Sequence, residues 1–93
     1  MSGRDVGVFA ISVAAEMTAL QIQNLRVYER RGLVSPDRTA GGTRLYSRDD
    51  IHRLHRIRDL LAAGLNLAGI AAVLELESEN KRLRREVHRL RGR

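Results

Sequence analysis

Cysteine is absent from the 93 residues, and so is tryptophan. Without thiols the chain can form no disulfide, no thiolate metal site and no thiol redox sensor. Its apolar stretches are interrupted by Glu16, Asn66 or Glu75 before any reaches the length of a membrane span. The first five residues lack the apolar core of a signal peptide. We therefore expect a cytoplasmic protein with no membrane contact.

Positive charge is abundant and comes almost entirely from arginine. Lys and Arg number 17 against 11 Asp and Glu, a net charge of +6, and Lys81 is the single lysine. Guanidinium groups suit bidentate contact with phosphates and guanine edges. The sequence offers no nucleophile–base pair, phosphate-binding loop or paired carboxylates, so we expect a nucleic-acid-binding protein and not an enzyme.

The first third of the chain predicts two short helices in close succession. Residues 8–11 are apolar and β-prone, and Ser12 follows as a candidate N-cap for a helix over 13–18. A tight turn at 19–21 leads into a second helix over 22–31. Two short helices joined by a three-residue turn form a helix-turn-helix.

Side-chain type supports this motif. Ala15 is small enough for a close helix crossing, whereas Ala19 stands where the turn usually has glycine. We expect the second helix to bury Ile22, Leu25 and part of Tyr28. Gly32 would end it, since glycine tolerates the left-handed conformation that follows a helix.

The start of the second helix is the predicted reading element, because this end enters the major groove in such motifs. Amide side chains can pair with adenine, valine can contact a thymine methyl, and arginine and tyrosine suit phosphates or base edges. The candidate contacts are Gln21, Gln23, Asn24, Arg26, Val27, Tyr28 and Arg30. A solvated polar helix start would look the same, so these residues alone leave both interpretations open.

A short ribbon follows, and it favours DNA. Pro36 blocks a helix, and Gly41-Gly42 marks a turn between two short extended segments. Donors suited to a phosphate backbone crowd this predicted wing: Arg38, Thr39, Arg44 and Tyr46. Alternatively, Tyr46 could belong to the core and the arginines could be solvated. Taken together, the helix pair and the ribbon predict binding to double-stranded DNA. We therefore expect the protein to associate with the nucleoid.

Two further helices are delimited by their caps. Ser47 and Asp50 form a capping box for a helix that ends at Gly64, and Asn66 caps the next. The apolar stripe of the first of these helices is Ile51, Leu54, Ile57 and Leu61. That of the second is Leu67, Ile70, Val73 and Leu74.

The C-terminal segment predicts a coiled coil. Its heptads place Val73, Asn80 and Val87 at a and leucines at every d, a seam typical of dimers in which the polar a residue sets the register. The candidate dimerisation residues are Leu76, Asn80, Leu83, Val87 and Leu90. A helix packed on its own domain, or a basic tail on DNA, is the alternative. Ser78 could begin a separate fifth helix.

The predicted fold is therefore mainly α: a winged helix-turn-helix DNA-binding domain over residues 1–74, then a dimerisation helix over 75–93. The amino-acid sequence of residues 24–38, followed by that of 42–46, resembles the signature of MerR-family regulators. Residues 11–16, 32–36, 66–70 and 74–77 resemble the actinobacterial heat-shock repressor (HspR) branch of that family. Residues 20–24 depart from the branch, which leaves the operator sequence open.

This resemblance implies a homodimeric repressor on an inverted-repeat promoter site of heat-shock and chaperone genes, with a DnaK-type chaperone as co-repressor. No cofactor is implied. The charges lean toward a parallel coil, with Glu79 facing Arg84, whereas the family implies an antiparallel one, which we expect. The alternatives are an architectural or excisionase-like DNA-binding protein and a helix-mediated interaction adaptor. His52 and His55 lie three apart on a helix, but no further ligand completes a metal site.

Overall fold

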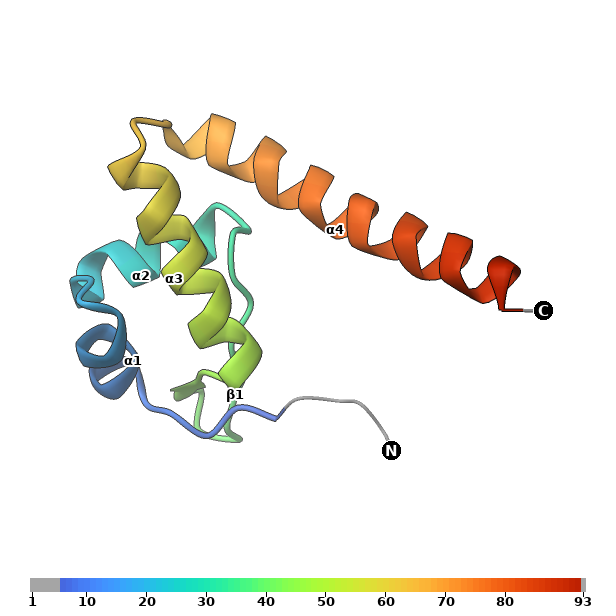
Figure 1. The fold of residues 1–93 in the computed structure, drawn as a ribbon. Coiled ribbons are helices and arrows are strands. Elements are labelled where there is room, and N and C mark those ends of the chain that lie inside the picture. The colour runs from blue at the N-terminus through green and yellow to red at the C-terminus, as the bar shows by residue number, and fades with distance from the viewer. Residues whose placement is uncertain (1–5, 93) are drawn as a thin grey trace. The chain divides into compact units, whose positions relative to one another are not determined.

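The computed structural model describes residues 6–92, so the segment 1–5 considered above lies outside the described part. In chain order the elements are α1 (Ile11–Thr18), α2 (Ile22–Arg30), β1 (Asp37–Arg38), β2 (Arg44–Leu45), α3 (Arg48–Ala62) and α4 (Leu67–Arg91) (Figure 1). They form two compact units, of which the first ends at Asp59 and the second begins at Leu60. We call the first unit the headpiece.

Helices α1 and α2 form the predicted helix-turn-helix. Ala14 and Ala15 are buried, as the close crossing requires. Ala19 has φ 57°, a left-handed conformation that costs a non-glycine residue about 1–2 kcal/mol. The Leu20 amide closes the turn by donating to the Ala15 carbonyl at 3.1 Å. The turn is therefore made with alanine where glycine would be unstrained.

The start of α1 differs from the prediction. The helix begins at Ile11 with Ala10 as its N-cap, so Ser12 lies inside the first turn and does not cap it. The predicted strand over 8–11 is reduced to a bridge between Phe9 and Tyr46. The Ala10 carbonyl already accepts the Ala14 amide at 2.9 Å. The extended stretch therefore ends at Ala10, because the helical hydrogen bonds of α1 begin there.

Helix α2 buries Leu25 and Tyr28, as predicted, but Ile22 remains 37% exposed. Ile22 is the first residue of the helix, one turn before Leu25, where fewer neighbours cover it. Gly32 has φ 75° and ends the segment as expected. The first turn of α2 is thus more exposed than its apolar pattern indicated.

The predicted ribbon is present and short. Its antiparallel strands pair Asp37 with Leu45 and Arg38 with Arg44. Gly42, at φ 87°, provides the turn, and its amide donates to the Thr39 carbonyl at 2.9 Å. We call β1, β2 and this turn the wing.

Helix α3 starts with the predicted capping box. The Asp50 amide donates to Ser47 Oγ at 3.0 Å, and the Ser47 amide donates to Asp50 Oδ2 at 2.9 Å. The buried stripe is Ile51, Leu54, Ile57 and Leu60. Leu61, which the prediction placed in this stripe, is only half-buried. A period of 3.6 residues allows either the third or the fourth residue after Ile57, and here the third is buried.

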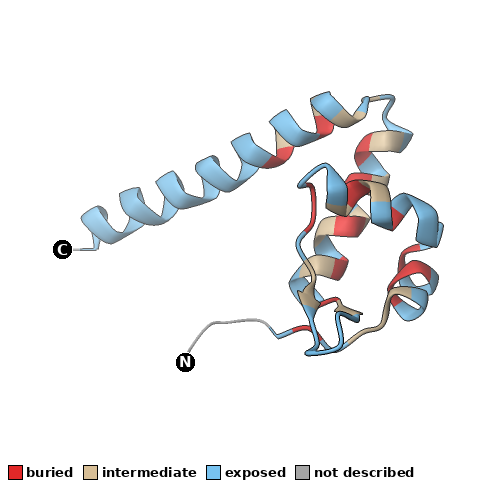
Figure 2. Ribbon diagram, turned by 180° about the vertical axis from the view of Figure 1, so that it is seen from behind, coloured by how far each residue is buried: buried red, intermediate tan, exposed pale blue. Residues whose placement is uncertain are grey.

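Two arginines of α3 tie the headpiece together. Arg58 Nη1 donates to the carbonyl of Thr18 at 2.9 Å, and Arg53 Nε donates to the carbonyl of Leu33. Thr18 is the last residue of α1, where carbonyls lack helical partners. The core includes Tyr46, Leu25 and Leu54, all fully buried. Each helix of the headpiece carries buried residues (Figure 2).

Helix α4 runs unbroken from Leu67 to Arg91, so the separate fifth helix is wrong. Asn66 caps it by accepting the Gly69 amide at 2.8 Å, as predicted. No glycine or proline follows Gly69 until Gly92, and Ser78 therefore lies within the helix. The predicted division at residue 74 falls inside this helix. No helix among the described residues is apolar enough over sufficient length to cross a membrane.

A glycine requirement at Gly7 tests the packing of the wing. A Cβ there would lie 2.3 Å from the Leu45 carbonyl oxygen, while the Gly7 amide donates to Asp37 Oδ2 at 2.9 Å. We expect Gly7→Ala to lower the free energy of unfolding by about 1–3 kcal/mol, as overpacking does. A Cβ at Gly41 would meet only Thr39 Oγ1, at an ordinary contact distance of 3.9 Å, so Gly41→Ala should change the free energy of unfolding little. Urea unfolding measures the free energy of unfolding of both variants. Equal values for the two would contradict the close approach of Gly7 to the Leu45 carbonyl.

Candidate nucleic-acid interface

The first turn of α2 presents its polar side chains to solvent. Gln21, Gln23, Asn24, Arg26 and Arg30 are exposed, and Val27 is half-buried. Gln21 is the N-cap but makes no capping hydrogen bond through its side chain. Its amide group is therefore not consumed by the helix start. The predicted reading surface has the exposure that contact with base edges needs.

Two residues predicted as DNA contacts, Tyr28 and Tyr46, are buried in the core. Tyr28 is 4% exposed and Tyr46 is fully buried. The Tyr46 hydroxyl makes no hydrogen bond within the described part of the chain. Burial raises the pKa of both phenols. The Tyr46 hydroxyl is buried, so the alternative interpretation of Tyr46 as a core residue is the correct one.

The wing arginines are held by a glutamate of α2. Glu29 Oε2 accepts from Arg38 Nη2 at 2.8 Å, and Glu29 Oε1 accepts from Arg44 Nε. Arg38 also donates through Nη1 to the Gly42 carbonyl at 2.9 Å. We call these three side chains the clamp. It joins the predicted recognition helix to the predicted wing.

Sequence reasoning missed Glu29, although a signal for it exists. Arg38 and Arg44 are direct partners in the ladder, and like charges directly opposite one another destabilise a sheet. A carboxylate between the two arginines relieves this repulsion. The neighbouring segments offered several carboxylates, however, and the ladder register was needed to choose among them.

The clamp perturbs the titration of its members. Burial alone raises the pKa of Glu29, but the hydrogen bonds from Arg44 and Arg38 outweigh it and hold that pKa below its usual range. The hydrogen bond to Glu29 raises the pKa of Arg44. Glu29 is therefore an anion at neutral pH, and it offsets part of the positive charge of the wing.

Thr39 has a structural role in the hairpin. Its Oγ1 accepts the Thr43 amide at 3.1 Å, close to the tip of the wing. Thr39 is nevertheless exposed, so its position suits a contact with the DNA backbone.

His52 and His55 line a shallow pocket of about 400 Å³ on the headpiece, together with Phe9, Met17, Arg48 and Ile51. The described residues contain no group of three side chains able to hold a metal ion.

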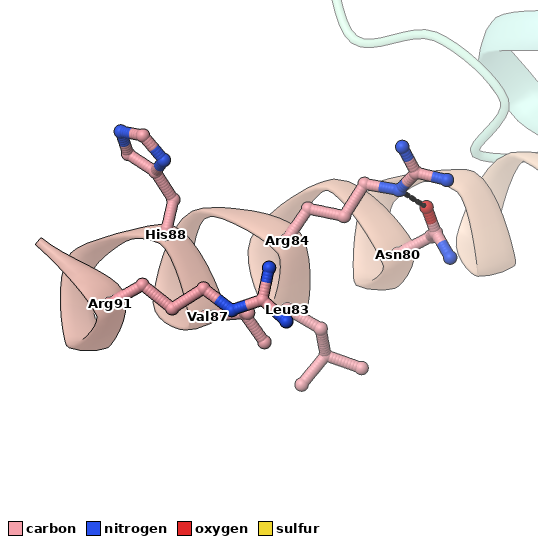
Figure 3. A pocket seen from close by; sticks show the side chains of 6 residues that line it. All are labelled: Asn80, Leu83, Arg84, Val87, His88 and Arg91. Carbon is pink, nitrogen blue, oxygen red and sulfur yellow. Dashed lines mark hydrogen bonds between the residues drawn. The ribbon is translucent and has the colours of Figure 1, made fainter.

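An exposed apolar stripe runs along α4. Leu76 is 68% exposed, Leu83 and Val87 47%, and Leu90 53%. Leu83 and Val87 line a shallow groove of about 370 Å³ with Asn80, Arg84, His88 and Arg91 (Figure 3). Within it, Asn80 Oδ1 accepts from Arg84 Nε at 2.8 Å. The predicted seam residues thus share one uncovered side of the helix.

The lowered pKa of Glu29 predicts a pH-dependent contribution to stability. A depressed pKa adds stability above the ordinary value of 4.5, and that stability is lost as pH falls through the lowered pKa. We expect the melting temperature of Glu29→Gln to fall below that of the unmodified protein near neutral pH. The gap should narrow below about pH 4.5.

Thermal melts followed by circular dichroism between about pH 3 and 7 measure this gap. Glu16→Gln, at an exposed glutamate of α1, is the matched control and should show no such narrowing. A gap for Glu29→Gln that stays constant across this range would contradict the charge-dependent clamp.

Comparison with known proteins agrees with this geometry. The MerR HTH family regulatory proteins match residues 9–77. A heat shock protein of Streptomyces coelicolor named HspR is 51% identical over 76 residues, which are 81% of this chain and 50% of that protein. The HTH-type transcriptional regulator GlnR of Bacillus anthracis is 45% identical over 78 residues, covering 84% of this chain and 60% of GlnR.

Among solved structures, a MerR-family transcriptional regulator from Bacillus cereus aligns with a TM-score of 0.68 at 30% identity, over 85% of this chain and 65% of that one. This chain spans between half and three fifths of the two sequence relatives. The relatives are transcriptional regulators and not enzymes, as the sequence predicted. The chain belongs to the MerR family of helix-turn-helix transcriptional regulators.

Proposed function

We propose that this protein is a homodimeric repressor that binds an inverted-repeat promoter site. Regulators of the MerR family bind double-stranded DNA, usually as dimers. The observation that carries the proposal is the exposed polar first turn of α2, held beside an arginine-bearing wing through Glu29. A recognition element and a backbone contact joined in this way suit a duplex with one specific register.

In this proposal the first turn of α2 reads base edges. Gln23 and Asn24 can each pair with adenine through N6 and N7, and Val27 can contact a thymine methyl. Gln21, Arg26 and Arg30 flank them as further donors to bases or phosphates. On the wing, Arg44 uses Nε for Glu29 and would offer its terminal nitrogens to a phosphate. Thr39 would contact the backbone near the tip.

The 51% identity to HspR supports heat-shock and chaperone genes as the regulated class. The resemblance to that branch extends the proposal to a DnaK-type chaperone as co-repressor. A footprint limited to one inverted repeat in a chaperone promoter, strengthened by added chaperone, supports this. Extended protected arrays would instead favour an architectural protein.

The stripe on α4 supports dimerisation through a second copy of the chain. An apolar stripe left in water on an isolated helix favours association. Its members repeat at a and d positions, the pattern that knobs-into-holes packing uses. A single winged head buries only about 600–1,000 Å² of DNA contact, so linking two heads raises affinity strongly.

The ion pairs along α4 support an antiparallel coil. Such a coil brings g positions together, which would set Glu79 near Glu86 of the partner subunit. Each of these glutamates already pairs within its own helix, Glu79 with Arg82 and Glu86 with Arg89. The repulsion that disfavours the antiparallel arrangement is therefore reduced.

The polar a position, Asn80, agrees with the same orientation. In a parallel coil Asn80 would face its own copy, a pairing that uses both amide groups. Here Asn80 Oδ1 is already satisfied by Arg84 within the helix. About 18 residues of seam span ~27 Å, so an antiparallel coil sets the two attachment points near opposite ends. That separation suits half-sites one turn, ~34 Å, apart.

Replacement of a reading residue tests the DNA interface. Gln23→Ala or Asn24→Ala should weaken binding to the preferred duplex by about 1–3 kcal/mol and relax discrimination at one base position. Ser78→Ala, on the exposed surface of α4, serves as control and should bind normally. Fluorescence anisotropy on preferred and scrambled duplexes measures both. An equal loss on the two duplexes would assign these amides to the backbone instead.

A charge within the seam tests dimerisation. Leu83→Asp should give a monomer in sedimentation that keeps its helical circular dichroism but loses most affinity for the inverted repeat. It should bind an isolated half-site about as weakly as one unmodified head does. Ser78→Asp adds the same charge at position f, outside the seam, and should remain dimeric. If Leu83→Asp stays a dimer with normal operator binding, α4 is not the interface.

A further inference from the structure

The two wing arginines are engaged to different degrees. Arg38 uses Nη2 for Glu29 at 2.8 Å and Nη1 for the Gly42 carbonyl at 2.9 Å, so each terminal nitrogen already has one acceptor within the protein, although 46% of its side chain is exposed. Arg44 gives Glu29 its Nε, the nitrogen nearest the chain. A guanidinium has five N–H donors in a fixed fork, and those on the terminal nitrogens reach farthest. The two side chains are therefore suited to different tasks.

Glu29 connects two elements that no backbone ladder joins. It lies in the last turn of α2, nine residues before Arg38 and fifteen before Arg44. Its side chain is mostly covered, and that of Arg44 is also largely covered. Because one carboxylate accepts from both strands of the wing, it fixes the wing relative to α2 and bridges the opposed Arg38–Arg44 pair.

We propose that Glu29 is a positioning residue that determines DNA specificity by fixing the wing relative to the recognition helix, with Arg38 as a surface strut whose terminal nitrogens already have protein acceptors and Arg44 as the phosphate contact. This inference rests on the proposed function. It departs from the sequence-based expectation that Arg38 contacts phosphate.

We expect Glu29 to lower the affinity for DNA in general and to raise the preference for one sequence over others. A carboxylate between two arginines cancels one positive charge of the wing, which weakens attraction to any duplex. In return the wing meets phosphate only when α2 lies in one register over the bases. Without Glu29 the arginines would be free to contact phosphates in many registers, so non-specific binding would gain more than specific binding.

Glu29→Gln tests this, because it removes the charge with little change of shape. Binding to a scrambled duplex should strengthen, and the slope of log K against log[salt] should steepen by up to about 0.9 per head. The ratio of affinities for the selected inverted repeat and the scrambled duplex should fall about tenfold, or ~1.4 kcal/mol. Glu16→Gln loses the same charge on α1 and should preserve the ratio.

Arg38→Gln separates the strut from the phosphate contact. As a strut, Arg38 should lower the specificity ratio when replaced and leave the salt slope unchanged. Arg44→Ala should instead flatten the slope by about 0.9 per head. If Arg38→Gln flattens the slope to the same extent, Arg38 binds phosphate and the assignment is wrong.

The salt slope also distinguishes positioning from simple loss of folded protein. A partly unfolded variant has fewer active molecules but the same slope, and circular dichroism reports the folded fraction. If Glu29→Gln folds and keeps both ratio and slope, the positioning role is overturned. If the unmodified protein shows no preference among duplexes, the proposed function fails instead.

Discussion

Helix α2 has one face in the core and an opposite, polar face in solvent, and the structure of the headpiece depends on keeping both faces in place. Leu25 and Tyr28 anchor one face in the core, while Gln23 and Asn24 remain in water on the other. With only nine residues the helix cannot be stable alone, so its position depends on these buried contacts. Glu29, in the last turn of α2, accepts hydrogen bonds from both wing arginines and so fixes the wing relative to the helix. Core packing and the exposed polar surface that we propose reads DNA are therefore linked through one short helix.

Not every arginine of the headpiece is free to contact DNA, so the net charge overstates the number of available cationic groups. Arg53 and Arg58 donate to the carbonyls of Leu33 and Thr18, where they join segments of the fold. Arg38 and Arg44 share the carboxylate of Glu29. Such charge-assisted hydrogen bonds are stronger than neutral ones, and they convert basic residues into structural ones. On α2, by contrast, Arg26 and Arg30 remain exposed.

The two units bury apolar surface in different ways. The headpiece encloses its core within a single chain, with Tyr46 and Leu54 fully covered. Beyond Leu74 the apolar side chains of α4 stay exposed, although they repeat with the period of a seam. Intrahelical pairs such as Glu79 with Arg82 supply local stability but bury nothing. In the dimer that we propose, a second copy of α4 would cover this stripe.

Features that depend on neighbours along the chain were predictable from the sequence. The Ser47–Asp50 box, the Asn66 cap and the left-handed Gly32 each involve hydrogen bonds or torsions within about four residues, where residue type decides the outcome. The signature over 24–38 and 42–46 likewise indicated the family. The cap of α1 was misplaced because Ser12 satisfied a local rule that a helix starting at Ile11 overrode.

Tertiary structure decided which polar groups are available. Tyr28 and Tyr46 look like DNA contacts by type, but packing buries both. Glu29 meets Arg38 and Arg44 across nine and fifteen residues, and Arg58 meets Thr18 across forty. Side-chain pattern carries no information about such distant partners, because burial and ion pairing depend on where the elements pack. The exposed side of α2 and the arginines committed to the fold became assignable only once those partners were in place.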